Sequence, residues 1–72
     1  MSKEEKENLQ ALLKYWIAHN EDHSTEFSEW AEKAKSMGEL EVSKDLKQAV
    51  EYMNKANALF SQSLKKLGGK GK

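Results

Sequence analysis

Residues that are mostly apolar recur every seven positions along almost the whole chain. This spacing keeps one seam of a helix turned toward a neighbouring helix. The first half of the chain carries two such series side by side, and so does the second half. Their members are Leu9, Trp16, His23, Trp30 and Met37 beside Leu13, Asn20, Phe27 and Ala34, then Val42, Ala49, Ala56 and Ser63 beside Leu46, Met53, Phe60 and Leu67. The pattern predicts two long helices.

Start and stop signals give these helices their bounds. Ser2 stands before an acidic first turn, which is the pattern of an N-cap residue followed by charges that suit the helix dipole. Gly38 follows the first pair of series, and a glycine just past a helix end is a common stop signal. We therefore expect helices at about 3–37 and 39–67, followed by a flexible basic tail at 68–72.

The two helices are expected to pack as an antiparallel hairpin, an all-α fold formed by one domain of residues 1–67. A break near residues 20–24 is the alternative, because Asn, Asp, Ser and Thr favour caps and turns. That break would give a three-helix bundle. A bare hairpin buries each apolar stripe against one neighbour, so it is expected to dimerise into a four-helix bundle or to bind a protein partner.

Charge and composition narrow the range of partners. Residues 1–41 hold ten acids and five lysines, whereas residues 42–72 hold two acids and seven lysines. These opposite charges favour pairing within the molecule over a charged external partner. All twelve basic residues are lysine, and the absence of the planar arginine fork argues against nucleic-acid recognition.

The sequence has no segment typical of a membrane span or a secretion signal, and it has no cysteine. The chain has no run of about twenty apolar residues, so no membrane span is expected. Its charged start lacks the apolar stretch of a secretion signal, which makes the cytoplasm the expected location. The absence of cysteine removes disulfides and thiolate metal sites.

A histidine pair is the candidate site. On a helix that turns about 100° per residue, His19 and His23 differ by about 40°, and Glu26 lies about 20° to the other side of His19. Two imidazoles and a carboxylate on one face can hold a divalent ion. The spacing predicts a divalent-metal site formed by His19, His23 and Glu26.

A polar layer between the helices offers a structural interpretation of the same residues. In a hairpin turned at Gly38, facing positions have numbers that sum to about 77, which sets Asn20 opposite Asn57 and His23 opposite Asn54. Buried polar side chains of this kind can hydrogen-bond to one another and fix helix register. Under this interpretation the chain is a non-catalytic interaction or oligomerisation module.

Catalytic patterns are missing from the sequence. The histidine pair lacks the glutamate of a His-Glu-x-x-His zinc-protease motif, and the Glu-x-x-His pairs of di-iron bundles are absent. The serines have no convincing base and orienting group for nucleophilic catalysis. We therefore expect a protein that is not an enzyme.

A further set of spaced residues runs from the first predicted helix into the second. Its members are His19, Asn20, His23, Phe27, Trp30, Ala31, Lys33, Ala34, Gly38, Glu41, Val42, Leu46, Ala49, Val50, Glu51, Ala56, Asn57 and Leu59. In these residues, and over about residues 9–67, the chain resembles a small uncharacterised all-helical domain of archaea and anaerobic bacteria. That domain is found alone or beside a small nickel-binding accessory module related to carbon monoxide dehydrogenase maturation. The resemblance implies a metal-related context, singles out the histidines with Asn20 and Asn57, and supplies no enzyme activity. Together with the spacing it leads us to expect nickel or zinc as the bound ion.

Overall fold

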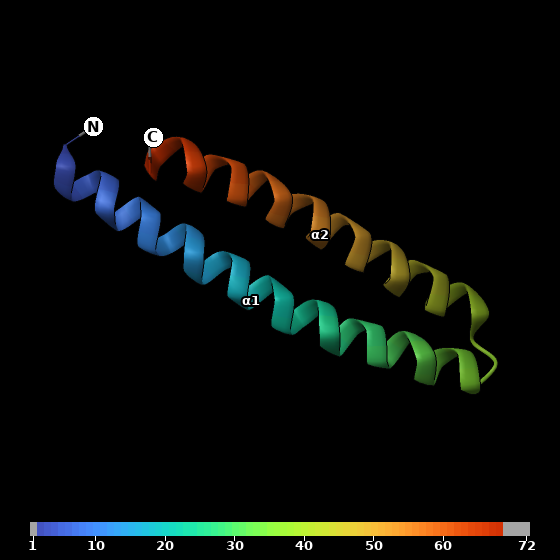
Figure 1. The fold of residues 1–72 in the computed structure, drawn as a ribbon. Helices are drawn as coiled ribbons and strands as arrows, with labels where there is room; N and C mark the ends of the chain where they lie inside the picture. Colours follow the sequence, from blue (N-terminus) through green and yellow to red (C-terminus); the bar gives the residue numbers. More distant parts are fainter. Residues whose placement is uncertain (1, 69–72) are drawn as a thin grey trace.

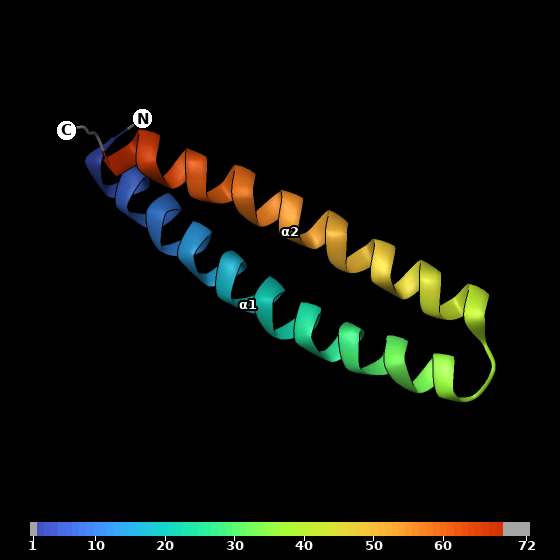
Figure 2. The same cartoon turned by 45° about the vertical axis from the view of Figure 1, so that its right-hand side comes forward.

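The chain folds into a hairpin of two antiparallel α-helices (Figure 1). The computed structural model describes residues 2–68, in which α1 spans Lys3–Ser36 and α2 spans Leu40–Gly68. The helices lie side by side in both views and form a rod of 52 × 16 × 16 Å (Figure 2). The predicted all-α hairpin is confirmed. Of the predicted tail, Gly68 belongs to α2 and residues 69–72 lie outside the described residues.

Both ends of α1 are formed by the residues that the sequence singled out. The Ser2 hydroxyl accepts a hydrogen bond from the Glu5 backbone N–H, and the Glu5 carboxylate accepts one from the Ser2 N–H, each at 3.1 Å. This reciprocal pair is a capping box. At the other end Gly38 has a φ of +84°, which allows the Glu39 N–H to donate to the Ala34 carbonyl at 2.9 Å. A residue with a Cβ would be strained in this turn.

Helix α1 runs without a break through its polar middle, so the three-helix alternative with a break near residues 20–24 is wrong. The polar side chains there do not compete with the helix backbone. The Thr25 hydroxyl donates back to the Glu21 carbonyl at 3.2 Å, and the Ser24 hydroxyl reaches the Met53 sulfur of α2 at 3.9 Å. Their hydrogen bonds are therefore made with the helix intact.

The core of the hairpin is narrow and consists mainly of small side chains. Leu13, Ala31, Ala34 and Ser43 are the buried residues, and within residues 2–68 no large side chain is fully buried. The Ser43 hydroxyl donates to the Ala31 carbonyl at 2.8 Å, which shows how closely the helices approach near the turn. A single hairpin therefore leaves most of its large apolar side chains partly in water.

The helices carry opposite net charge, as the sequence indicated. Helix α1 has eight acids and five lysines, and α2 has three acids and five lysines. One ion pair joins them in the described part of the chain, with 3.5 Å between the Lys47 Nζ and a Glu32 carboxylate oxygen. Both side chains are more than half exposed, so this pair contributes little to stability. Within residues 2–68, neither helix has the apolar length that a membrane crossing requires.

Candidate functional site

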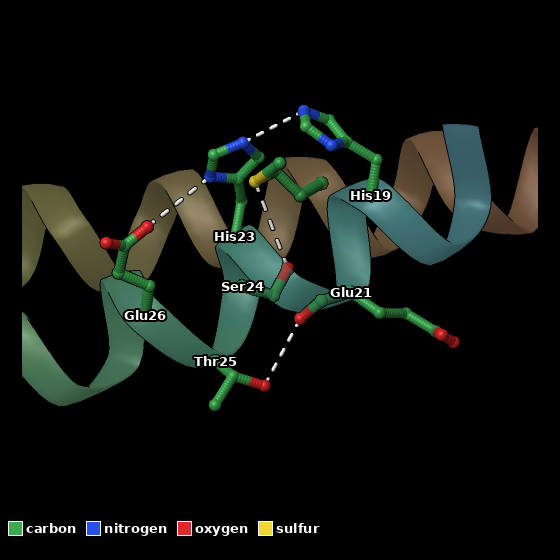
Figure 3. A network of polar contacts seen from close by, with 7 residues as sticks. His19, Glu21, His23, Ser24, Thr25 and Glu26 are labelled. Atoms are coloured by element: carbon green, nitrogen blue, oxygen red, sulfur yellow. Dashed lines mark hydrogen bonds and ion pairs between the residues drawn. The ribbon is translucent and has the colours of Figure 1, made fainter. Parts of the chain in front are cut away.

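The two histidines of α1 face each other across one helical turn (Figure 3). Their Nε2 atoms lie 3.0 Å apart, and the rings meet edge to face with centroids separated by 4.4 Å. Figure 3 shows both rings projecting from the same side of the helix, away from Thr25. The four-residue spacing thus brings His19 and His23 together as the sequence predicted it would on one helix face.

Glu26 contacts the other nitrogen of the second ring. One of its carboxylate oxygens lies 3.5 Å from the His23 Nδ1. A carboxylate in this position favours the proton on Nδ1, which turns the Nε2 lone pair toward His19. The His19 Nε2–H can then donate to that lone pair. Glu26 therefore orients the ring from outside the gap between the two Nε2 atoms.

The three predicted metal ligands do not converge on one point in this conformation. Across residues 2–68, no group of three or more His, Cys, Asp or Glu side chains is arranged to hold a metal ion. What the structure brings together is a pair of imidazoles with a carboxylate behind one of them. A complete coordination sphere would need ligands from water or from another chain.

Two aromatic rings hold the histidines in place. Tyr15 stacks on His19 and Phe27 stacks on His23, each with centroids 5.5 Å apart and nearly parallel planes. The result is a ladder of four rings spaced four residues apart along α1. Sequence reasoning missed the role of Tyr15, although the spacing of these four aromatic or imidazole side chains was visible in the chain. Such stacking limits the rotation of both imidazoles.

The site lies open to solvent. The His23 side chain is 39% exposed and the Glu26 side chain 59% exposed. The described part of the molecule encloses no pocket, so a ligand here would bind on a surface. Glu21 and Asp22 are exposed beside the pair and give this stretch of α1 a negative surrounding.

A second polar pair lies at the same level but points between the helices. The Asn20 amide donates to the Asn57 side-chain oxygen at 3.0 Å, and the Asn57 amide donates to the Ile17 carbonyl at 3.2 Å. Both side chains are part-buried. Within residues 2–68, no buried side-chain nitrogen or oxygen lacks a partner. Asn57 thus ties α2 to α1 at two points.

Asn54, which the sequence placed opposite His23, is exposed. Among the hydrogen bonds of residues 2–68, none joins Asn54 to either histidine. At this level of the hairpin, a hydrogen bond from the Ser24 hydroxyl to the Met53 sulfur joins the helices. The predicted layer is therefore divided, with the asparagine pair between the helices and the histidine pair outside.

Fold and site together define a small helical hairpin that displays an oriented histidine pair on its first helix. Residues 9–67 match the model of a family described as a domain of unknown function, DUF8180. Because the match covers most of the chain, the chain belongs to this family. Searches of the curated proteins and of the solved structures found no match.

Proposed function

We propose that this chain binds a divalent metal ion, nickel or zinc, through His19 and His23. The supporting observation is the 3.0 Å distance between the two Nε2 atoms. Metal–imidazole bonds of about 2.1 Å set neighbouring ligand nitrogens about 3.0 Å apart at a right angle and about 3.4 Å apart at a tetrahedral angle. The distance between the two nitrogens thus already fits a chelated ion, which would replace the proton that His19 carries on Nε2.

The ligand type agrees with this choice of metals. Neutral imidazole suits zinc, copper and nickel, and the two histidines leave further coordination positions open. The carboxylate of Glu26 behind His23 is the arrangement that fixes the tautomer and raises the basicity of a ligating ring. The resemblance to a domain found beside nickel-binding modules makes nickel the first ion to test and supports a role as a metal-accessory protein.

Calorimetric titration of nickel and zinc into the pure protein tests the proposal. We expect binding tighter than about 100 µM in the wild type and its loss in the double variant His19→Ala/His23→Ala. A matched control carries His19→Ala with Asp22→His, which keeps two imidazoles but sets them at neighbouring positions that do not share a helix face. Binding that is weaker than this limit, or equal in all three proteins, would overturn the proposal.

A second candidate function is a non-catalytic interaction or oligomerisation module. The asparagine pair favours it, because Asn57 hydrogen-bonds to two groups of α1 in the part-buried seam. In that case the polar residues set helix register and pairing. The double alanine variant would then change stability or oligomeric state, and there would be no metal affinity to lose.

A further inference from the structure

Large apolar side chains remain exposed along the hairpin. Trp30 is 51% exposed, Leu59 is 61% exposed and Tyr52 is 60% exposed. A single exposed apolar side chain is ordinary, but a contiguous set of this kind marks an interaction surface. The question is whether these side chains share one face.

One edge of the hairpin is identified by its hydrogen bonds. There the Ser43 hydroxyl reaches the Ala31 carbonyl and the Asn57 amide reaches the Ile17 carbonyl. These four residues belong to two seven-residue columns, one on each helix. A helix turns by about 100° per residue, so the rotation of any other residue from this edge follows from its place in the sequence.

The tryptophans lie on the opposite edge. Trp16 and Trp30 each precede a residue of the hydrogen-bonded edge and are therefore rotated by about 100° from it, on the far side of the seam. Trp16 meets Phe60 of α2 there, with ring centroids 5.8 Å apart. Val42 likewise precedes Ser43, so it lies on the same side of α2. The small residues Ala49 and Ala56 follow it there at seven-residue intervals. The exposed apolar residues on this side form what we call the apolar face: Leu12, Trp16, Trp30, Val42, Tyr52 and Leu59. The same seven-residue spacing sets His19 and His23 on the α1 part of this face.

We infer that a second copy of this chain covers the apolar face and completes a four-helix bundle. The dimensions of the hairpin fit this partner. A partner that lies along the full 52 Å length and 16 Å width of the rod covers about 800 Å², which is the amount that each partner buries in a stable interface of standard size, and a second copy has the length to do so. The chain has no net charge, so two copies do not repel each other.

The composition of the two helices sets the arrangement of the copies. Helix α1 has a net charge of −3, from eight acids and five lysines, and α2 has +2, from three acids and five lysines. The apolar face also has bulky tryptophans on α1, whereas α2 has the small side chains Ala49 and Ala56, which are only partly covered. Both differences favour α1 of each copy against α2 of the other.

A two-fold axis along the length of the hairpin satisfies this arrangement. It holds the apolar faces of the two copies in contact, packs α1 of each copy against α2 of the other and sets both Gly38 turns at the same end. His23 lies between Trp16 and Trp30 in one seven-residue series, so a second copy on this face also covers the histidine pair. The inference therefore concerns the metal-free chain, and its test is made without metal.

Sedimentation equilibrium in a metal-free buffer with chelator, at about 100 µM protein, tests the partner. We expect a mass of about 16 kDa, twice the 8.2 kDa of one chain. Leu59→Glu should raise the dimer dissociation constant at least about tenfold, since it sets a charge in the interface. Leu40→Glu is the matched control: this leucine is also in α2 and is 59% exposed, but it lies one heptad before Lys47 on the other side of the helix. A wild-type mass of one chain, or equal effects of the two substitutions, would overturn the inference and assign the face to another partner.

The direction of the two-fold axis can be tested separately, by a distance between the two turns. Residue 39 lies in the turn between the helices. Because the chain has no cysteine, a spin label attached through Glu39→Cys reports one distance per dimer. Turns at the same end predict a label separation below about 25 Å, roughly the width of two helices side by side. A separation near the 52 Å length of the rod would mean that the turns are at opposite ends and would contradict the proposed axis.

Discussion

Two polar pairs lie at the same level of the hairpin and differ in what surrounds them. Asn20 and Asn57 hydrogen-bond across the seam, and Asn57 also donates to a backbone carbonyl of α1. His19 and His23 instead face each other on the surface of one helix. The fold engages both the oxygen and the nitrogen of the Asn57 side chain, whereas in the described part of the chain the histidine nitrogens make polar contacts only within α1.

This difference separates a register-setting role from a binding role within adjacent positions of one helix. A group that the fold already uses between the helices is costly to remove and has little to offer a ligand. A group that is held in place by stacked rings and open to solvent can be removed at small cost. Stability and metal affinity should therefore respond to different substitutions.

The largest expected effect concerns metal-dependent stability. At a nickel concentration one hundred times its dissociation constant, the free energy of unfolding of the wild type should rise by about 2.7 kcal/mol. The rise should be absent in His19→Ala/His23→Ala and present in Asn57→Ala. Urea unfolding followed by circular dichroism, at one fixed protein concentration, measures it. Equal metal-dependent gains in both variants would remove the distinction between the pairs.

The next effect is the loss of the asparagine contact in the absence of metal. Asn57→Ala leaves the part-buried Asn20 amide without its partner and should lower the free energy of unfolding by roughly 2 kcal/mol. Asn54→Ala is the control, because Asn54 is exposed on the same helix and its removal should change stability by less than about 0.5 kcal/mol. Similar losses from the two alanines would argue against a register role for Asn57.

A smaller loss is expected at the histidines themselves. Without metal, His23→Ala removes its stacking on Phe27 and its edge contact with His19, and should cost about 1 kcal/mol. The same urea unfolding measurement applies. A loss as large as that of Asn57→Ala would place the histidine pair among the groups that hold the helices together, and would favour the interaction module over the metal site.

The smallest effect concerns Glu26. Glu26→Gln keeps the shape of the side chain but removes the charge beside the His23 Nδ1, so nickel affinity should fall about threefold, a small change because the carboxylate is largely exposed. Glu29→Gln removes an equal charge from another exposed position of α1 and should leave the affinity within error. Isothermal titration of both variants gives the comparison, and a loss of more than tenfold at Glu26 would instead indicate direct coordination.

Much of the fold was predictable because its signals are local. The seven-residue series set both helices, and Gly38 and Ser2 mark ends whose hydrogen bonds involve residues three to five positions away. The facing of Asn20 and Asn57 followed from counting outward from the turn. The doubt about residues 20–24 arose because propensity alone does not show that Ser24 uses its hydroxyl on α2.

The finer features of the candidate site depend on side-chain rotation, which residue spacing does not determine. Counting from the turn gives only the level of Asn54 along the rod. Its exposed side of α2 follows from the seven-residue column that it shares with Leu40 and Lys47, so this part of the error was avoidable. Spacing also set Glu26 near the histidines without showing that it meets Nδ1 of one ring. The stacking of Tyr15 and Phe27 depends on ring torsions in the same way.

The two tryptophans are placed so that their fluorescence can report on the histidine pair. Trp16 and Trp30 each stand seven residues from His23, one on either side, which is about 10 Å along the helix. Nickel quenches indole emission at short range, so an ion held by His19 and His23 would dim both native fluorophores. The occupancy of the site can then be followed by light alone, without any label.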